Sequence, residues 1–384
     1  MKICHLCLNG PYTEGFSYQE NLLPKYHVRL GYEVYQIVTP FTWQGNRIAN
    51  IGEEKYTNDF GVHIIRCLPK KNILGKRFYT YPNALIELNK IKPDILFIHD
   101  VQFLDATKVA DYLNENPNCL SFADNHCDYS NSAKNWLSKH ILHKIIWRHC
   151  AKALLPYINR FYGVLPARVD LLTELYGIPK EKCALLVMGA DDDEVKRSSN
   201  IKNIIKTRKK FGFTSDDFVI VTGGKIDKWK TETLSLMEAY KDIALPNLKL
   251  LVFGAVDSSM KERFNELLKN SKIVYVPWAR FEESFDLFSM SDLVVFPGRH
   301  SVYWEQVVGQ GKPMICKLWD GTKHIDIGGN VAFLKDSSVK EIKDLLLKLV
   351  NDPEEYKKML EAASSEKRLD FLYSKIASNS ISTK

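Results

Sequence analysis

The sequence predicts an α/β protein built on two open parallel sheets. Short apolar runs alternate with amphipathic helical segments in both halves of the chain, which is the pattern of βα arrays. Polar residues gather directly after several of these runs, where ligands bind in such sheets. The alternation breaks at residues 189–193 (GADDD) and then begins again. We therefore expect two Rossmann-like domains, 1–189 and 190–366, facing across a cleft. Residues 367–384 should form a C-terminal helix that packs back on the first domain.

The composition is that of an ordinary globular chain. Its 384 residues are 45% hydrophobic, which suits two domains. We find no apolar run of the roughly 18–20 residues that a membrane span needs, and MKICHLCLNG lacks the features of a secretory signal. The net charge of +7 is modest and no nucleic-acid-binding motif is present, so we expect no nucleic-acid partner.

The eight cysteines are scattered, which indicates a reducing compartment and a cytoplasmic protein. Cys4 and Cys7 form a CxxC pair, but both fall within a predicted strand, Lys2–Leu8. We therefore interpret them as buried strand thiols rather than a redox or zinc pair.

The first strand is followed by a glycine-containing loop, Asn9–Gly15. Ser17 is the expected N-cap of a helix that runs to about Leu30, with a kink at Pro24. Asn9, Gly10 and Gly15 are candidate ligand contacts, because glycines let the backbone approach a bound molecule. The alternative is an ordinary strand-to-helix turn. The loop lacks the GxGxxG spacing of a dinucleotide site.

Two further strand ends of the first half carry polar clusters. His99 and Asp100 end one strand, and Asp124, Asn125, His126 and Asp128 follow another. Asp124 and His126 are our catalytic candidates, because both residue types can exchange a proton with a bound hydroxyl near neutral pH. The cluster also has the composition of a metal site, but its spacing is not diagnostic, and we predict no metal. The elements expected here are strands at Tyr32–Val38, Val62–Arg66, Asp94–His99 and Leu120–Ala123, and helices at Pro82–Lys90 and Gln102–Leu113.

Residues 134–155 predict a basic amphipathic helix. Its basic residues, within Lys134–Lys152, interleave with apolar ones, so the segment suits either an anionic membrane surface or a sheet with solvated lysines. A strand at Arg160–Val164, a helix at Pro166–Tyr176 and a strand at Ala184–Met188 complete the first half. The Asp triplet at 191–193 is either a metal-binding DxD motif or a linker with a helix cap, and we favour the cap.

The second half places a glycine- and lysine-rich loop after the strand Phe218–Thr222. Gly224, Lys225 and Lys230 in this loop can hold a diphosphate through backbone approach and positive charge. Trp278 follows the strand Ile273–Val276 and is either a base contact or a core residue. Further elements are predicted as helices at Ile201–Phe211, Ser258–Leu267, Glu282–Met290, Val339–Val350, Pro353–Glu366 and Phe371–Ser378, and a strand at Leu248–Phe253.

The stretch VVFPGRHSVYWEQVVGQGKP, Val294–Pro313, predicts a strand, a polar loop, a helix and a second strand. Ser301 is the expected N-cap of the helix that begins near Val302. Glu305 would lie in its first turn, where the helix dipole favours the ionised form. A carboxylate fixed there suits the two hydroxyls of a ribose, although a solvated Glu is the plain alternative.

These residues resemble those of glycosyltransferase family 4, which has the GT-B fold, over nearly the whole chain. Lys225 and Lys230 stand where the family places a basic pair on the nucleotide diphosphate. Glu305 matches the second Glu of the family's E-x7-E motif, which holds the ribose, and Gly311 and Pro313 match its end. The Asn9–Gly15 loop matches the acceptor loop, with His99 beside it, and His126 the strand-end His near the reacting sugar.

The chain departs from the family pattern at two points. The first Glu of E-x7-E would fall at Pro297, and Gly298, Arg299, His300 and Ser301 stand in that region instead. Lys225 replaces an Arg and loses its bidentate geometry. His300 and Ser301 are therefore expected near the donor sugar, whose identity the sequence leaves open.

The resemblance implies a retaining transfer of a sugar from a nucleotide-diphosphate sugar, which we expect to be UDP-linked, to a hydroxyl of a glycan or lipid-linked acceptor. Lysines and helix N-termini would neutralise the leaving diphosphate without a metal or other cofactor, and domain closure would exclude water. The implied role is surface polysaccharide synthesis, in the cytoplasm or on the inner face of the membrane. The rival interpretations are a sugar-nucleotide epimerase of the same fold and a non-catalytic sugar-nucleotide or glycan-binding protein.

Overall fold

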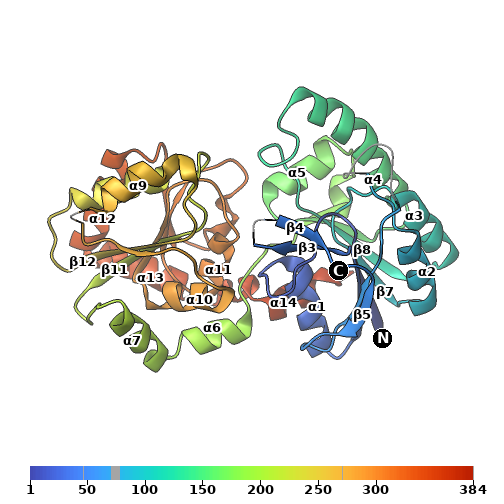
Figure 1. The fold of residues 1–384 in the computed structure, drawn as a ribbon, viewed down its shortest axis with the longest axis horizontal. Coiled ribbons are helices and arrows are strands. Elements are labelled where there is room, and N and C mark those ends of the chain that lie inside the picture. The colour runs from blue at the N-terminus through green and yellow to red at the C-terminus, as the bar shows by residue number, and fades with distance from the viewer. Residues whose placement is uncertain (46, 71–77, 270, 384) are drawn as a thin grey trace. The chain divides into compact units, whose positions relative to one another are not determined.

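The computed structural model describes residues 1–45, 47–70, 78–269 and 271–383. It divides into two compact units (Figure 1). Unit 1 comprises Met1–Val187 and Tyr373–Lys384, and unit 2 comprises Met188–Leu372. The chain therefore passes into unit 2 two residues before the predicted boundary, and it returns to unit 1 at Tyr373 rather than at residue 367.

Unit 1 is built on an eight-stranded sheet with the order β10-β9-β8-β7-β1-β2-β6-β5. Its neighbouring strands are parallel except β5 and β6, which pair antiparallel. The strand order reverses direction at β1, and ligands of open sheets bind at the carboxyl ends around such a switch point. The strands are β1 Lys2–Cys7, β2 Glu33–Val38, β5 Glu54–Thr57, β6 His63–Arg66, β7 Ile95–Ile98, β8 Leu120–Asn125, β9 Arg160–Gly163 and β10 Cys183–Leu185, with a separate hairpin of β3 Phe41–Gln44 and β4 Arg47–Asn50.

The alternation of side chains along β1 assigns the helices to the two faces of this sheet. Cys4 and Leu6 join the large core cluster beneath α2 and α3, to which Leu88 and Val109 also belong. His5 points to the opposite face, where α1 packs against the C-terminal helix α14. The helices of unit 1 are α1 Gln19–Arg29, α2 Pro82–Ile91, α3 Ala106–Glu115, the π-helix η1 Ser138–Trp147, α4 Arg148–Leu154, α5 Pro166–Glu174 and α14 Tyr373–Ser380, with the 3-10 turn η2 Lys180–Lys182.

Unit 2 holds a six-stranded parallel sheet with the order β13-β12-β11-β14-β15-β16. Helices α8, α9 and α12 pack together on one face, and α6, α7 and α10 on the other (Figure 1). The strands are β11 Phe218–Gly223, β12 Leu248–Phe253, β13 Val274–Val276, β14 Leu293–Phe296, β15 Met314–Lys317 and β16 Val331–Leu334. The helices are α6 Asp192–Ser198, α7 Ile201–Lys210, α8 Glu232–Lys241, α9 Lys261–Leu268, α10 Phe281–Met290, α11 Tyr303–Gly309, α12 Val339–Asn351 and α13 Pro353–Ala363, with 3-10 turns η3 Ser258–Met260, η4 Lys323–Ile325 and η5 Glu366–Phe371.

Several local predictions are corrected by the structure. Tyr18, not Ser17, is the N-cap residue of α1. Val302, not Ser301, is the N-cap residue of α11, and the Ser301 hydroxyl lies 3.5 Å from the Tyr303 N–H. Helix α3 begins four residues after Gln102, at Ala106, because the backbone is irregular at residues 102–103 and turns at residues 104–105. The hairpin β3–β4 and the strand β5 were not predicted.

Other local predictions are confirmed. Asp191 caps α6 by accepting a hydrogen bond from the Asp193 N–H, so the Asp triplet supplies a helix cap. Cys4 and Cys7 are buried in β1, and all eight cysteines are free. None of the helices in the described part of the chain is both long and apolar enough to cross a membrane.

Candidate functional site

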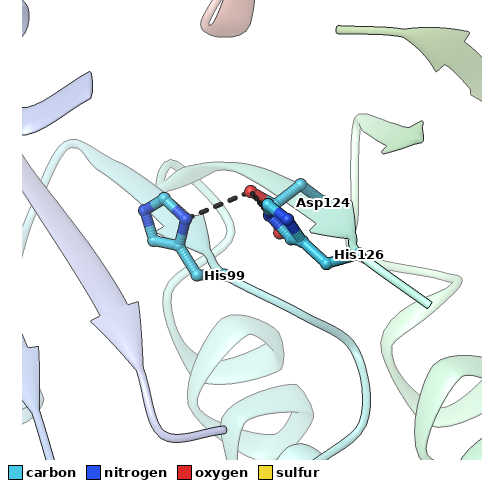
Figure 2. A group of neighbouring side chains, drawn as sticks. All are labelled: His99, Asp124 and His126. Carbon is cyan, nitrogen blue, oxygen red and sulfur yellow. Dashed lines mark hydrogen bonds and ion pairs between the residues drawn. The ribbon is translucent and has the colours of Figure 1, made fainter. Parts of the chain in front are cut away.

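The polar cluster of unit 1 lies where β7 and β8 end side by side. Asp124 is near the end of β8 and His126 follows it, while His99 comes directly after β7. One carboxylate oxygen, Asp124 Oδ2, lies 3.1 Å from His99 Nδ1 and 3.3 Å from His126 Nε2 (Figure 2). His99 and His126, which were predicted at two separate strand ends, thus contact the same carboxylate.

Burial gives these three residues different roles. Asp124 is fully buried, and although burial raises its pKa, His126 and His99 hold the pKa far below its usual range, so the carboxyl is ionised. The His126 side chain is 25% exposed. Burial lowers the pKa of His126, but Asp124 outweighs this effect and raises it. His126 is therefore the group that can reach a substrate, and Asp124 is the group that orients it.

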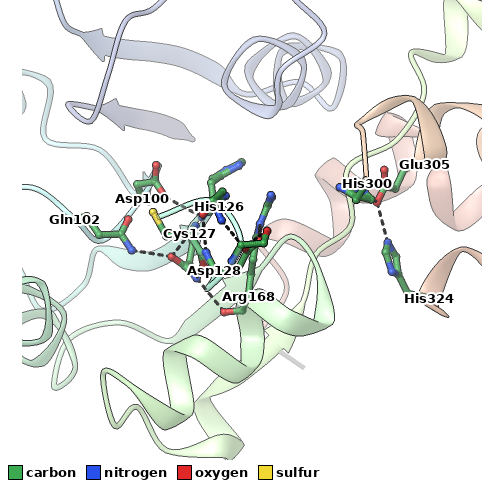
Figure 3. Close-up of polar contacts among 12 residues, drawn as sticks. Asp100, Gln102, His126, Cys127, Asp128, Arg168, His300, Glu305 and His324 are labelled. Carbon is green, nitrogen blue, oxygen red and sulfur yellow. Dashed lines mark hydrogen bonds and ion pairs between the residues drawn. The ribbon is translucent and has the colours of Figure 1, made fainter. Parts of the chain in front are cut away.

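Asp100 connects this cluster to the loop after β1. Its backbone N–H donates to Asp124 Oδ1 at 2.8 Å, and its Oδ1 accepts from the His126 N–H at 2.8 Å (Figure 3). The Asn9 side chain donates to Asp100 Oδ2 at 3.1 Å. Asp100 has a φ of 66°, in the left-handed region that only a minority of non-glycine residues adopt. Such strain is found at functional sites, where the surrounding hydrogen bonds maintain it.

His99, Asp124 and His126 also have the composition of a metal site, since one ligand atom from each lies within 4.8 Å of the others. Both ring nitrogens of His99 are, however, engaged in hydrogen bonds. Nδ1 faces Asp124, and Nε2 lies 2.9 Å from His5 Nδ1. We therefore interpret the group as a hydrogen-bonded network, and the predicted absence of a metal stays a prediction.

A cavity of about 570 Å³ opens at the same edge of the unit 1 sheet. Asn9 and Gly10 line it, as expected for a ligand loop, but Gly15 and His99 are not among its lining residues. Aromatic rings and side-chain amides dominate its wall, and no Lys, Arg, Asp or Glu lines it in the described part of the chain. The residues that set this character are Phe41, Tyr79, Tyr81, Phe103, Trp147, Asn50, Gln102 and Asn131.

Glu305 is the central group of unit 2. It is fully buried, and its Oε1 accepts hydrogen bonds of 2.8 Å from His300 Nε2 and 2.8 Å from His324 Nε2 (Figure 3). Burial raises the pKa of Glu305, but the two histidines outweigh it and lower the pKa to about 2. The two histidines thus favour the expected ionised form. Among the described residues, Oε2 has no hydrogen-bond partner.

The glycines at the end of β11 permit very close packing. A Cβ on Gly223 would lie 2.1 Å from the Phe253 ring, and one on Gly254 would lie 2.1 Å from the Gly224 carbonyl oxygen. Lys225 is 65% exposed and lies 3.8 Å from Asp227. Lys230 is half-buried, and burial lowers its pKa, although Asp227 partly offsets this effect. The loop therefore presents one exposed and one partly desolvated cation.

The remaining predicted residues of unit 2 lie at the same sheet edge, after β13 and β14. Trp278 is 68% exposed, so it is not a core residue, and a ligand contact stays a prediction. His300 is held by Glu305. The loop residue Gly298 packs against the Lys230 backbone, since a Cβ there would lie 3.5 Å from Lys230 Cα. The loop that replaces the expected first Glu thus borders the lysine loop.

Sequence analysis missed His5, His27 and His324. His5 lies in an apolar strand and His27 in a helix, and we assigned both segments to secondary structure without giving either histidine a role. A histidine within a fully buried strand was the available signal for His5. His324 follows β15 in a short 3-10 turn, and we find no local pattern that points to Glu305.

No family model and no curated protein matches the chain. Solved structures match its fold over nearly its whole length. Anabaena HepE in complex with UDP is 13% identical, with 99% of this chain and 98% of that chain covered and a TM-score of 0.67. WaaG, a glycosyltransferase involved in lipopolysaccharide biosynthesis, is 14% identical, with 99% of both chains covered and a TM-score of 0.65.

A third match is UDP-GlcNAc 2-epimerase from Neisseria meningitidis bound to UDP-GlcNAc. It is 15% identical, with 100% of this chain and 99% of that chain covered and a TM-score of 0.62. Identities this low show the fold alone. The chain has the GT-B fold, as predicted, whereas membership of glycosyltransferase family 4 stays a prediction.

Proposed function

We propose that the protein is a retaining glycosyltransferase that uses a nucleotide-diphosphate sugar, which we expect to be UDP-linked. The observation that carries this proposal is Glu305, a buried ionised carboxylate with one oxygen that lacks a partner in the described structure. A ribose hydroxyl would satisfy that oxygen. Lys225 and Lys230 would neutralise the leaving diphosphate, so we propose that no metal is required. HepE, whose fold the chain shares, was solved with UDP.

In the proposed reaction, an acceptor hydroxyl oxygen bonds to the anomeric carbon of the sugar as the bond from that carbon to the diphosphate breaks. As the new bond forms, the hydroxyl proton passes to Nδ1 of neutral His126, the ring nitrogen that does not face Asp124, and the nucleoside diphosphate leaves as the anion. His126, oriented by Asp124 and partly exposed, is the residue placed to hold that hydroxyl. General acid–base groups of this kind contribute about 100- to 10,000-fold to a rate.

The cavity in unit 1 narrows the class of acceptor. Its aromatic rings suit the apolar faces of sugar rings, and its amides suit hydroxyls. Because no charged side chain lines it among the described residues, we propose that an uncharged glycan portion of the acceptor enters it. Any phosphate of a lipid-linked acceptor would lie outside the cavity. A role in surface polysaccharide synthesis is consistent with such an acceptor.

We also propose that the π-helix η1 and the residues before it contact an anionic membrane from the cytoplasm. The predicted packing on unit 1 is observed for His143 and Trp147, while other residues of the segment are exposed. Trp136 is 69% exposed and Ile145 is 58% exposed, and Leu137 and Ile141 are exposed with them. Lys134 and Lys144 flank these residues and are exposed as well. Apolar side chains bordered by lysines are typical of interfacial helices.

The function is tested by incubating the full chain with UDP-sugars, with and without a panel of neutral saccharides. We expect acceptor-dependent release of UDP and a product whose anomeric configuration, read by NMR, matches the donor. His126→Ala should lower the rate at least about 100-fold, and the exposed His149→Ala should not.

The same assay separates the two rivals. Sugar-nucleotide epimerisation is the second candidate function, and the match to UDP-GlcNAc 2-epimerase favours it. An epimerase would convert the donor sugar without any acceptor. A binding protein would retain the nucleotide sugar and turn over nothing. Inversion at the anomeric carbon would contradict the retaining mechanism.

A further inference from the structure

Beneath Asp124, three buried histidines form a continuous hydrogen-bonded chain across unit 1. His99 Nε2 lies 2.9 Å from His5 Nδ1, and His5 Nε2 lies 2.9 Å from His27 Nδ1. His27 Nε2 lies 3.1 Å from the Ala377 carbonyl oxygen of α14. The chain therefore begins at the candidate catalytic carboxylate and ends on the C-terminal helix. None of its three histidines contacts the proposed ligand cavity.

The chain ends at Asp124 and at the Ala377 carbonyl, which can only accept hydrogen bonds, and its His27 end also meets the Ser380 hydroxyl, which can donate. Asp124 is an ionised carboxylate, and a backbone carbonyl has no proton to give. His5 and His27 are fully buried, and His99 is nearly so, so the hydrogen bonds must be satisfied by protein groups rather than by water.

Counting protons shows that three neutral histidines are not sufficient when the Ser380 hydroxyl donates to the Ala377 oxygen, 2.8 Å away. Four hydrogen bonds lie in series, from Ala377 to His27, His5, His99 and Asp124. Each bond needs one ring proton, whereas three neutral imidazoles carry three. One of the rings must therefore carry a second proton and a positive charge.

The geometry also fixes which ring is charged. Ala377 requires a proton on His27 Nε2, so neutral His27 accepts at Nδ1 from His5 Nε2–H. Neutral His5 then accepts at Nδ1 from His99 Nε2–H. The extra proton completes His99 Nδ1–H, which donates to Asp124.

The direction of the chain depends on the Ser380 hydroxyl, which lies 3.1 Å from His27 Nε2 and 2.8 Å from the Ala377 oxygen. We assign its single proton to the shorter contact, the Ala377 oxygen. Donated to His27 Nε2 instead, that proton would let three neutral rings satisfy the chain in the opposite direction. The pKa values agree with this assignment. Burial lowers the pKa of His27 to about 4 and that of His5 well below its usual value. Burial also lowers the pKa of His99, but Cys7 and Asp124 raise it well above the ordinary value. The other ionisable groups that act on the cluster are Glu20, Asp100 and Arg168.

We propose that His5 and His27 are positioning residues that hold one permanent proton on His99, so that an imidazolium lies against Asp124 and sets the proton affinity of His126. The imidazolium offsets part of the negative charge that Asp124 presents to His126. If the chain is cut at His27, two bonds remain between His5, His99 and Asp124, and two neutral rings can satisfy them. The extra proton is then released to solvent, and Asp124 attracts a proton on His126 more strongly.

The test is long-range proton–nitrogen NMR on the full chain with labelled histidines, from about pH 6 to 8. In the wild type, we expect His99 to show two protonated ring nitrogens, and His5 and His27 to be neutral with the proton on Nε2. In His27→Phe, His99 should become neutral and His5 should move its proton to Nδ1. The titration midpoint of His126 should rise by about one pH unit or more. The exposed His149→Gln is the matched control and should change none of these signals.

Ser380→Ala decides the direction of the chain. It should leave the three protonation states unchanged, because Ala377 remains as the acceptor. A neutral His99 in the wild type, or protons on Nδ1 of His5 and His27, would overturn the proposal, as would a stoichiometric metal bound at His99. The wild-type spectrum decides the question even if His27→Phe fails to fold. Because no sugar nucleotide is involved, the result is independent of the proposed glycosyl transfer.

Discussion

At the scale of single residues, the two units use the same arrangement. Asp124 is held by His99 and His126, and Glu305 by His300 and His324. Each carboxylate is fully buried and lies at the carboxyl edge of a parallel sheet. Burial alone would favour the neutral acid, and in each case the two histidines reverse this preference. The outcome is a fixed negative charge at the carboxyl edge of each unit's sheet.

The Glu305 carboxylate should make stability depend on acid pH. Its pKa falls from 4.5 when unfolded to about 2 when folded. Its contribution is therefore fully present above about pH 4.5 and is lost as the pH falls towards 2, amounting to roughly 3 kcal/mol. We expect the free energy of unfolding of Glu305→Gln to be lower at neutral pH and to fall less steeply with acid.

Urea unfolding of both chains at a series of pH values measures this difference. The exposed Glu361→Gln is the control and should follow the wild type. Parallel acid profiles of the wild type and Glu305→Gln would show that the two histidines do not stabilise the charge.

At the scale of elements, the apolar patterns were sufficient to predict most strands and helices. β12, Leu248–Phe253, has the predicted bounds, and α12 ends one residue beyond its prediction. The hairpin β3–β4 was missed because its half-exposed residues lack a continuous apolar run. Hydrogen bonds between residues that are distant in sequence were also missed, because only the folded chain brings His5, His27 and His324 next to their partners.

The π-helix η1 provides a prediction at this scale. Replacing Ile141 and Ile145 together by Ser removes exposed apolar area without touching the buried His143. We expect wild-type protein to sediment with vesicles that contain anionic lipid and the double variant to bind several-fold more weakly.

Ile201 and Ile205, which are exposed on α7 of unit 2 among lysines, supply a matched control pair. Substituting them by Ser should leave vesicle binding unchanged. Equal binding of wild type and the Ile141/Ile145 variant would contradict the proposed membrane surface.

At the scale of the whole molecule, the chain returns to unit 1 after completing unit 2. Helix α14 buries Tyr373, Ile376 and Ala377 and packs against α1. Sequence reasoning placed this helix on the first domain, but its role as the end of the histidine chain required the coordinates. The stability of unit 1 should therefore depend on helix α14, which follows unit 2 in sequence.

Truncation after Leu372 tests this dependence. We expect hydrogen exchange to increase in α1 and β1, because their cover is lost, while the strands of unit 2 keep their protection. An equal loss of protection from exchange in both units, or no change in α1, would contradict the conclusion that α14 stabilises unit 1 alone.

The most direct test of the proposed donor site is a thermal-shift screen of nucleoside diphosphates in the presence of a metal chelator. A ligand at about 100 times its dissociation constant adds roughly 2.7 kcal/mol to the folded state. We predict that UDP raises the melting temperature, that Lys230→Ala and Glu305→Ala lose this increase, and that Lys357→Ala on α13 keeps it. If no nucleoside diphosphate stabilises the wild type, the donor site is wrong and the chain shares only the fold of the glycosyltransferases.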